Sequence, residues 1–400
     1  MKKLVLIGGG HSHAIALRYF INQPLVNTQI TLITDVLQAP YSGMLPGYVA
    51  GFYDYAECHI DLDKLARVAG VDIIVAGVSC LALDRQQITC SNGQVFSYDL
   101  LSVNTGSTPD LSQISGANNY GTPVKPVPQF LTVWQDILES WKDDQNEEKS
   151  LTITLVGGGA GGVELALNMQ QQLVNIYKLK SKLKDKLKPK LENHKLKINL
   201  IHRNLDLLPN YNQRVGKYLR NLLHDRGIEI YLGESVQEIV PKTSSKNNAG
   251  YNLHCQSGLE VWSDRVFWVT NAAAPTWIKT SGLATDRSGF IAVNNYLQST
   301  SHPQVFAVGD IAAMVNYQLP KAGVFAVRQG LPLAQNLQRL TQEKALQPYK
   351  PQSRYLGLIG TGDQKALAVY GDLGLFGDVV GGCLWRWKDG IDRKFMRQFP

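Results

Sequence analysis

The sequence lacks the features that mark a membrane-spanning, secreted or disulfide-bonded protein. No run approaches the ~18 consecutive apolar residues that a spanning helix needs. The basic start Met1–Lys3 resembles a signal peptide, but only Leu4–Ile7 follow before three glycines, which is shorter than the ~7–15-residue apolar core of such peptides. The five cysteines are scattered and form no CxxC or CxxxxC pair, which disfavours a disulfide scaffold and a zinc ribbon. These absences predict a cytoplasmic protein.

What is present is an ordinary globular composition with a basic balance. The 400 residues are 44% hydrophobic and 18% charged, which suits two or three domains of roughly 100–200 residues. The formal net charge of +7 suits nucleic acid, an anionic membrane or anionic ligands. Nine lysines fall within Tyr177–Lys197, but no aromatic residue follows Tyr177 there. A solvated helix is therefore favoured over a nucleic-acid surface, and no nucleic-acid partner is expected.

The pattern of strand, glycine turn and helix occurs twice, about 150 residues apart. Leu4–Ile7 precedes three glycines and an apolar helical stretch over Ala14–Ile21, and Ile30–Thr34 follows as a second strand. Thr152–Val156 precedes the cluster Gly157–Gly162 and another helical stretch. Each is the opening of a βαβ unit. The sequence therefore predicts an α/β fold with two Rossmann-like dinucleotide-binding domains.

The second glycine cluster matches a dinucleotide-binding turn at every position. Gly157-x-Gly159-x-x-Gly162 follows a strand and opens a helix. The three glycines serve a tight turn, close approach of the backbone to a pyrophosphate, and close packing of helix on strand. The N–H groups and dipole of the helix start then hold the phosphates. The alternative interpretation is a glycine-rich turn without a ligand.

The first cluster, Gly8-x-Gly10-x-x-His13, departs from the motif because His13 replaces the third glycine. We therefore expect this helix to stand farther from its strand. Asp35 lies 22 residues after His13, where an acid would bind a ribose hydroxyl. Thr34 occupies the more usual position for that acid, so the role is assigned to Asp35 provisionally.

Two basic residues end the strand that follows the second cluster. His202 closes Lys197–His202, Arg203 comes next, and no acid follows before Asp206. An acid there suits NAD, whereas a basic residue suits the 2′-phosphate of NADP. The sequence favours NADPH, or use of both donors, over strict NADH; the alternative is a basic surface pair.

Three histidines are candidate metal ligands, but their spacing does not support a metal site. His11 and His13 flank the first glycine turn, and no third ligand lies at a suitable spacing from them or from His59. No metal is expected. Polar groups are expected at a helix start, so His11 is assigned to the cofactor turn instead.

Several further motifs carry a family resemblance. Leu101–Ser107 and Trp268–Pro275 each end a strand, and Thr300–Asp310 places an aspartate just after a strand and a glycine. With these the chain resembles the two-dinucleotide-binding flavoproteins related to glutathione reductase, and among them the type II NADH dehydrogenases. It is most similar to the flavoprotein module found fused ahead of selenide, water dikinase domains. That module shares GGGHSH, APYSGMLPG, HIDL, KAGVFAVRQG and WRWKDGIDRKFM, which stand here at residues 8–13, 39–47, 59–62, 321–330 and 385–396.

The resemblance implies a division of the chain and a set of cofactor contacts. An FAD domain would take residues 1–115 and 281–345, an NAD(P)H domain residues 116–280, and a C-terminal segment residues 346–400. FAD would be bound by residues of the first glycine turn and of later strand ends, namely Gly8, Gly10, His11, Asp35, Pro40, Leu45, Val78, Thr105, Gly106, Gly309, Asp310, Ala322 and Gly323. NAD(P)H would be bound by Gly157, Gly159, Gly162, His202, Arg203 and Asn271.

Two residues are candidates for a direct part in the chemistry. The resemblance places Glu164 near the nicotinamide and the flavin, where it would position NAD(P)H or relay protons; pairing with a nearby cation is the alternative. Lys321, just before the expected helix start, would add a positive charge at the flavin, or else lie exposed. Disulfide reductases carry their redox cysteines in the segment that corresponds to Pro40–Gly47, which contains none here. The electrons would therefore pass directly from the flavin to the acceptor.

The basic and aromatic segment Leu384–Phe399 has five basic and two acidic residues. That pattern is typical of a helix at an anionic membrane surface; docking on the protein itself is the alternative. The leading hypothesis is an FAD-dependent NAD(P)H:quinone oxidoreductase, cytoplasmic or peripheral on the cytoplasmic face of a membrane. The alternatives are a soluble flavoprotein reductase of another redox pathway, for example one related to selenium, and a non-catalytic flavin- or nucleotide-sensing module. Whether a homodimer forms is left open.

Overall fold

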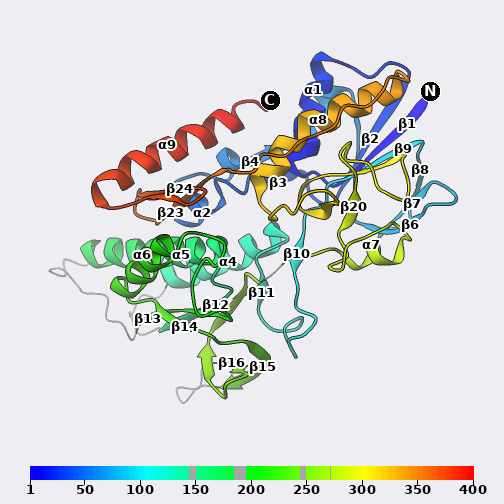
Figure 1. Cartoon of the computed structure of the whole chain (residues 1–400). Coiled ribbons are helices and arrows are strands. Elements are labelled where there is room, and N and C mark those ends of the chain that lie inside the picture. Colours follow the sequence, from blue (N-terminus) through cyan, green and yellow to red (C-terminus); the bar gives the residue numbers. More distant parts are fainter. Residues whose placement is uncertain (144–149, 184–194, 244–248, 271) are drawn as a thin grey trace.

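The computed structural model describes residues 1–143, 150–183, 195–243, 249–270 and 272–400. Its first domain is built on a five-stranded parallel sheet in the order β21-β9-β1-β2-β5 (Figure 1). The strands are β1 (Lys2–Ile7), β2 (Thr28–Thr34), β5 (Asp72–Val75), β9 (Leu100–Val103) and β21 (Val305–Ala307). Since β21 comes some 200 residues after β9, the chain leaves this sheet, builds the second domain and returns.

Two long helices from opposite ends of the sequence cover this sheet side by side. They are α1 (His11–Asn22) and α8 (Gly323–Thr341), and both lie at the top of Figure 1. The Tyr19 hydroxyl on α1 donates to Gln338 on α8 at 3.0 Å. A Cβ at Gly330 would stand 2.7 Å from the Ile15 side chain. The missing side chain at Gly330 therefore allows the close packing of the two helices.

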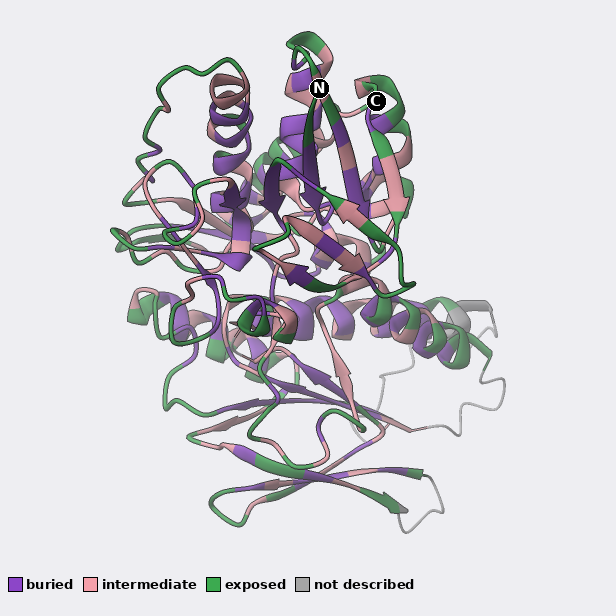
Figure 2. Cartoon of the chain, turned by 90° about the vertical axis from the view of Figure 1, so that its right-hand side faces the viewer, coloured by how far each residue is buried: buried purple, intermediate pink, exposed green. Residues whose placement is uncertain are grey.

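The second domain repeats the arrangement on another five-stranded parallel sheet, in the order β11-β18-β12-β13-β14. Its strands are β11 (Thr122–Pro123), β12 (Leu151–Val156), β13 (Leu196–His202), β14 (Glu229–Leu232) and β18 (Arg265–Trp268). Its helices are α4 (Val127–Asp143), α5 (Ala160–Leu183) and α6 (Gln213–Asp225). The central strands β9 and β12 are largely buried, as their apolar runs predict, and the strands of both sheets are mostly purple in Figure 2.

Smaller elements join and flank the two sheets. Antiparallel sheets are formed by β6 (Val78–Ala82), β7 (Gln87–Cys90) and β8 (Val95–Ser97), and by β15 (Val236–Thr243), β16 (Ala249–Cys255) and β17 (Glu260–Ser263). Two-stranded pairs are β3 (Gln38–Pro40) with β4 (His59–Asp61), β10 (Thr108–Pro109) with β19 (Ala272–Ala273), and β20 (Ile291–Val293) with β22 (Ala312–Met314). Short helices are α2 (Leu45–Val49), η1 (Ala56–Cys58), α3 (Leu62–Ala69), α7 (Thr276–Thr280) and η2 (Gly309–Ile311).

The C-terminal segment connects the cores of the two domains. It consists of the antiparallel strands β23 (Leu356–Gly360), β24 (Ala366–Tyr370) and β25 (Leu373–Leu375), followed by α9 (Asp378–Met396), which is red in Figure 1. Ile359 packs into the core of the second domain, whereas Phe395 packs into the core of the first. The segment therefore holds the domains together, and none of the helices in the described ranges is long and apolar enough to cross a membrane.

The structure confirms the predicted α/β fold with two parallel sheets. The lysine-rich stretch expected as a solvated helix is described only as far as Leu183, where α5 ends, and residues 184–194 lie outside the described ranges. Residues 244–248 also fall outside them, and the flanking strands β15 and β16 pair antiparallel.

His13 has a structural role that its departure from the glycine motif did not reveal. The ring is fully buried, and its Nδ1 and Nε2 lie 2.7 Å from the Gly8 carbonyl oxygen and 2.8 Å from Ser102 Oγ. Burial lowers the pKa of His13 to about 4, against an opposing effect of the Gly8 carbonyl. The imidazole therefore fills the space between helix and strand as a neutral hydrogen-bonded group.

We predict that His13→Ala lowers the free energy of unfolding by about 2–4 kcal/mol, because it leaves a cavity and unpaired polar atoms. Thermal or denaturant unfolding measures the loss, and the exposed His224→Ala serves as the control. The stabilisation by neutral His13 is present above pH ~6.5 and is lost as the pH falls towards about 4. Equal stability of the two variants would contradict this account of His13.

Candidate functional site

The first glycine turn is held tightly against the end of β9. Gly8 has φ +89°, and a Cβ there would lie 2.6 Å from the Asn104 carbonyl oxygen. A Cβ at Gly10 would overlap the Asn104 side chain. The Asn104 side chain is itself fixed, since its Nδ2 donates to the Val308 carbonyl at 2.8 Å. The turn therefore leaves room for backbone alone, as a pyrophosphate-binding turn requires.

A cavity opens where the strands of the first sheet end. The residues predicted for FAD binding that line it are Gly8, Gly10, His11, Asp35, Pro40, Val78, Thr105, Gly106, Asp310 and Gly323. They lie in β3 and β6, shortly after the ends of β1, β2, β9 and β21, and at the first residues of α1 and α8, so many separate elements converge on one site. Leu45, Gly309 and Ala322 do not line this cavity, although Gly309 and Ala322 each precede a residue that does.

Two buried polar atoms in the lining have no partner among the described residues. They are His11 Nε2 and Thr105 Oγ1. Burial lowers the pKa of His11 to about 4, with the Pro40 carbonyl opposing it, so the ring is neutral at pH 7. Buried polar atoms without partners are costly and rare in folded proteins. These orphaned atoms, with the side-chain-free turn beside them, fit a polar ligand such as FAD.

Asp310 is placed in the cavity by two side chains that the sequence did not single out. Its Oδ2 receives Lys125 Nζ at 2.8 Å and Ser107 Oγ at 3.1 Å. Burial acts to raise the pKa of Asp310, but Lys125 and Ser107 outweigh burial and hold the pKa below its ordinary value. The carboxylate is therefore ionised and oriented. Both Lys125 and Ser107 line the cavity with it.

Lys321, the cation expected at the flavin, does not line this cavity. Its Nζ donates to the Ala312 carbonyl at 2.8 Å and stands 3.7 Å from the centre of the Phe290 ring. Burial lowers the pKa of Lys321 to about 8. The ammonium is thus neither exposed nor directed into the cavity. Lys125 is the cation that lines the cavity in its place.

The start of α8 lies at the cavity. The helix begins at Gly323 after the N-cap residue Ala322, and Gly323 and Ala326 both line the cavity. A Cβ at Gly323 would stand 2.7 Å from Ser42 Oγ of the facing wall. The N-terminal amides and dipole of α8 favour a negative charge developing there.

The second glycine turn, like the first, has a glycine with positive φ and a position where a side chain would overlap the backbone. Gly157 has φ +128°, a Cβ at Gly162 would overlap the Gly157 carbonyl oxygen, and a Cβ at Gly159 would meet open space. His202 is buried beneath this turn, where its Nδ1 accepts the Gly158 amide at 3.1 Å, whereas Arg203 is exposed. The predicted contact at Asn271 lies outside the described residues.

Glu164, the fifth residue of α5, lies among groups from the C-terminal segment. Its Oε1 accepts the Gly360 amide of β23 at 2.7 Å. Although part of its surface remains accessible, the surrounding protein atoms raise the pKa of Glu164 to about 7, and Lys388 opposes that rise. The carboxyl group is therefore poised to gain or lose a proton near neutral pH.

The sequence predicted α9 as an amphipathic helix but assigned some of its residues to the wrong side. Lys388, counted there as a membrane-facing basic residue, is buried; its Nζ contacts the Gly43 carbonyl and lies 2.8 Å from Asp392 Oδ2. Phe395 is also buried and stacks on Tyr41. Docking on the protein was thus the better interpretation for one face of α9. That face contacts the Pro40–Gly47 segment.

All five cysteines are free thiols, and none of them lines the cavity. Within the described ranges, no group of three or more His, Cys, Asp or Glu side chains is arranged to hold a metal ion.

The two parallel sheets, each with a glycine turn at its strand ends, define a two-domain dinucleotide-binding oxidoreductase. The chain belongs to the pyridine nucleotide-disulphide oxidoreductase family, whose sequence profile matches residues 2–336. Members of this family bind FAD and NAD(P)H. The disulfide of the family's name has no counterpart among the cysteines that the structure describes.

Individual relatives are distant in sequence but similar over most of the chain. The NADH dehydrogenase-like protein YutJ of Bacillus subtilis is 22% identical over 394 residues, which cover 97% of this chain and 99% of YutJ. A type II NADH:quinone oxidoreductase of Haemophilus influenzae is 26% identical over 216 residues, 53% of this chain and 45% of that protein. The structure of NDH2 from Plasmodium falciparum in complex with NADH superposes with a TM-score of 0.77 at 16% identity, covering 100% of this chain and 97% of that one.

We predict that Lys125→Gln weakens FAD retention by about ten- to a hundredfold, because a charged contact of roughly 1.5–3 kcal/mol is lost and Asp310 is left buried without its cation. Lys321→Gln is the matched control, since its ammonium is held outside the cavity. Flavin fluorescence on titrating stripped protein with FAD measures both affinities. A larger loss with Lys321→Gln would mean that the cation of the site has been misassigned.

Proposed function

We propose that this protein is an FAD-dependent NAD(P)H dehydrogenase that passes two electrons to a quinone without a redox disulfide. The observation that carries the proposal is the convergence of both glycine turns on one region. The helix α5, which starts at the second turn, packs against α2, which begins within the Pro40–Gly47 segment. That segment contributes Pro40 and Ser42 to the cavity of the first turn. Two dinucleotides bound at these turns would meet beside it.

The residues of the cavity would hold FAD through contacts along its whole length. Gly8 and Gly10 would admit the pyrophosphate, Asp35 would accept the adenosine ribose hydroxyl, and Val78 would lie beside the adenine. His11, Thr105 and Gly106 would pair with polar atoms of the cofactor, while Asp310 would bind its ribityl chain. Pro40 and Gly323 would lie beside the flavin ring. Leu45, Gly309 and Ala322 do not line the cavity and would contribute through these neighbouring residues. When bound, FAD would accept the hydride of NAD(P)H and supply two electrons to the acceptor.

Glu164 would serve the nicotinamide side of the site. It is the fifth residue of α5, the helix that begins within the second glycine turn, and its carboxylate accepts the Gly360 amide of β23. A carboxyl group whose pKa is about 7 can hold a proton or release it at neutral pH. Glu164 would therefore position NAD(P)H or move a proton there. Lys321 would affect the site only indirectly, by holding the Ala312 backbone carbonyl in place.

The donor preference would rest on Arg203. Burial lowers the pKa of His202, and its ring accepts the Gly158 amide, so His202 would shape the turn as a neutral group. The exposed Arg203 then remains as the cation for a 2′-phosphate, with an exposed asparagine following it. This arrangement favours NADPH, or use of both donors.

We predict that Arg203→Ala lowers kcat/KM for NADPH by about one to two decades, a loss of roughly 1–3 kcal/mol, while kcat/KM for NADH changes little. Steady-state reduction of a soluble dye with each donor measures the two kcat/KM values. The exposed Arg220→Ala on α6 is the control for a change of surface charge. Equal losses for both donors would contradict a 2′-phosphate contact at Arg203.

A membrane quinone as acceptor is supported by relatives such as the type II NADH:quinone oxidoreductase of Haemophilus influenzae and by the outer face of α9. Trp387 and Ile391 are 50% and 40% exposed there. The exposed basic residues Arg386 and Lys394 lie on the same helix, and the exposed Arg397 follows directly after it. Exposed apolar side chains among basic ones suit an anionic membrane surface.

The function is tested by anaerobic absorbance spectra of the purified protein before and after NADPH or NADH. We predict a flavin spectrum that bleaches on addition of either donor and returns on addition of a quinone. Return only with soluble dyes or proteins would favour a soluble reductase of another redox pathway. A flavin that no donor bleaches would favour a sensing module and contradict the proposed dehydrogenase.

A further inference from the structure

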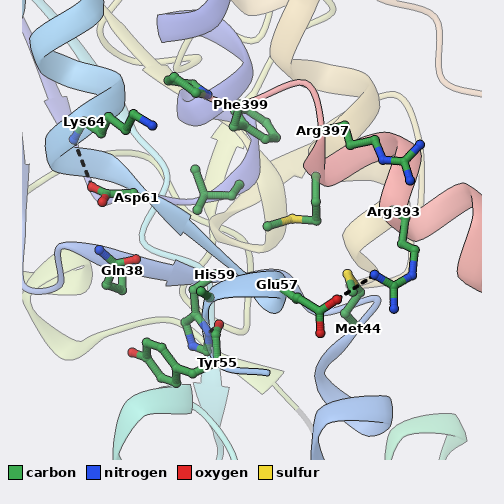
Figure 3. A pocket seen from close by; sticks show the side chains of 14 residues that line it. Gln38, Met44, Tyr55, Glu57, His59, Asp61, Lys64, Arg393, Arg397 and Phe399 are labelled. Atoms are coloured by element: carbon green, nitrogen blue, oxygen red, sulfur yellow. Dashed lines mark hydrogen bonds and ion pairs between the residues drawn. The ribbon is translucent and has the colours of Figure 1, made fainter. Parts of the chain in front are cut away.

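A second cavity is lined by residues of the β3–β4 pair and of the end of α9 (Figure 3). We call it the α9 cup. It is lined by Gln38, Met44, Tyr55, Ala56, Glu57, His59, Ile60, Asp61, Lys64, Arg393, Met396, Arg397, Phe399 and Pro400. Its volume of about 680 Å³ is within the ~300–1,000 Å³ range of small-molecule sites. Nothing in the proposed reaction uses it.

Two basic side chains that line the cup have no ion-pair partner among the described residues. They are Lys64 of α3 and Arg397 after α9, which lie at the left and at the right of Figure 3. Arg393 is different, because it is bound to Glu57 at 2.6 Å and to Asp389 at 2.9 Å. Lys64 and Arg397 are therefore the cations available to an anion.

The acidic groups of the cup are already satisfied. Glu57 accepts Arg393 and the Asp54 amide, and together these lower the pKa of Glu57. Asp61 caps α3 by accepting the Lys64 amide at 2.9 Å, and this bond lowers the pKa of Asp61. Both carboxylates thus have partners within the protein. An incoming anion would meet the two uncommitted cations, with the formal charge of the lining at +1 (Lys64, Arg393 and Arg397 against Glu57 and Asp61).

Between the charged walls the cup has an apolar floor. Ile60 and Met44 are buried, and Met396 and Phe399 are partly buried; Phe399 packs edge-on against Phe395. A ligand that fills the cup would place apolar atoms on this floor and negative charge between Lys64 and Arg397. That combination describes an anionic amphiphile rather than a small inorganic ion.

The cup is continuous with the outer face of α9. Arg397 belongs to both, and the exposed residues of the helix from Cys383 onward include Arg386 and Lys394 but no acid. The exposed side chains of Trp387 and Ile391 lie between those two basic residues in sequence. A membrane surface that meets this face would bring its lipid headgroups to the mouth of the cup.

We propose that the α9 cup binds the phosphate headgroup of an anionic phospholipid, with Lys64 and Arg397 as the phosphate-binding side chains. The inference rests on the proposed membrane association of α9, and it adds a defined lipid site to a general electrostatic attraction. Phosphate oxygens are strong acceptors for lysine and arginine, and the glycerol and first acyl carbons would cover Ile60, Met396 and Phe399.

The experiment compares two double variants that remove the same charge from the cup and from the outer face of α9. Lys64→Gln with Arg397→Gln empties the cup of its uncommitted cations, and Arg386→Gln with Lys394→Gln is the matched control. Binding of the FAD-loaded protein is measured by sedimentation with phosphatidylglycerol vesicles and with phosphatidylcholine vesicles. The flavin spectrum of each variant checks that the fold and the cofactor site are intact.

We expect the cup variant to lose at least tenfold more affinity for phosphatidylglycerol vesicles than the control variant, and to keep that deficit at raised salt, where exposed charges are screened. Equal losses would overturn the proposal in favour of general surface attraction. Glycerol phosphate that binds the native protein without any vesicle binding would overturn it in favour of a soluble anion. Failure of NAD(P)H to reduce the flavin would contradict the proposed function. It would not change the interpretation of the vesicle binding, which is measured independently of flavin reduction.

Discussion

The structure depends on the close approach of a bare backbone turn to the end of a neighbouring strand. Gly8 and Gly10 lie against Asn104 so closely that a side chain at either position would overlap it. Asn104 reaches in turn to Val308 beyond β21, which links three neighbouring strand ends. In a parallel sheet these ends lie at one edge. The cavity, its polar lining and the placement of Asp310 all follow from that edge.

The sequence predicted the parts of the site that depend on local structure. Strand, glycine turn and helix are neighbours along the chain, so their spacing alone identifies both glycine turns. It could not predict contacts made across long separations. Lys125 meets Asp310 across 185 residues, and Lys388 meets Gly43 across 345. Lys321 illustrates the same limit, because its position at the helix start was clear from the sequence while the direction of its side chain was set by Ala312 and Phe290.

The C-terminal helix shows how an amphipathic pattern can serve two surfaces at once. Its inner face carries the buried pair Lys388–Asp392, and the hydroxyl of Tyr41 also bonds to Asp392. A buried ion pair needs good geometry and further hydrogen bonds to offset the loss of hydration, and the Gly43 carbonyl and Tyr41 supply them. The helix thereby fixes the segment that borders the cofactor cavity, while its outer face keeps exposed aromatic and basic residues. A sequence pattern records both faces but not which partner each one meets.

The central claim is that the cavity beside Gly8 and Gly10 holds FAD. Titration of flavin-stripped protein with FAD, followed by quenching of flavin fluorescence, tests it most directly when the native chain is compared with Gly10→Val. The account predicts saturable binding at one FAD per native chain and its loss in the variant, in which the added side chain displaces Asn104 from the turn; circular dichroism checks that the variant is folded. Absence of saturable binding to the native chain, or equal binding by a folded Gly10→Val variant, would contradict it.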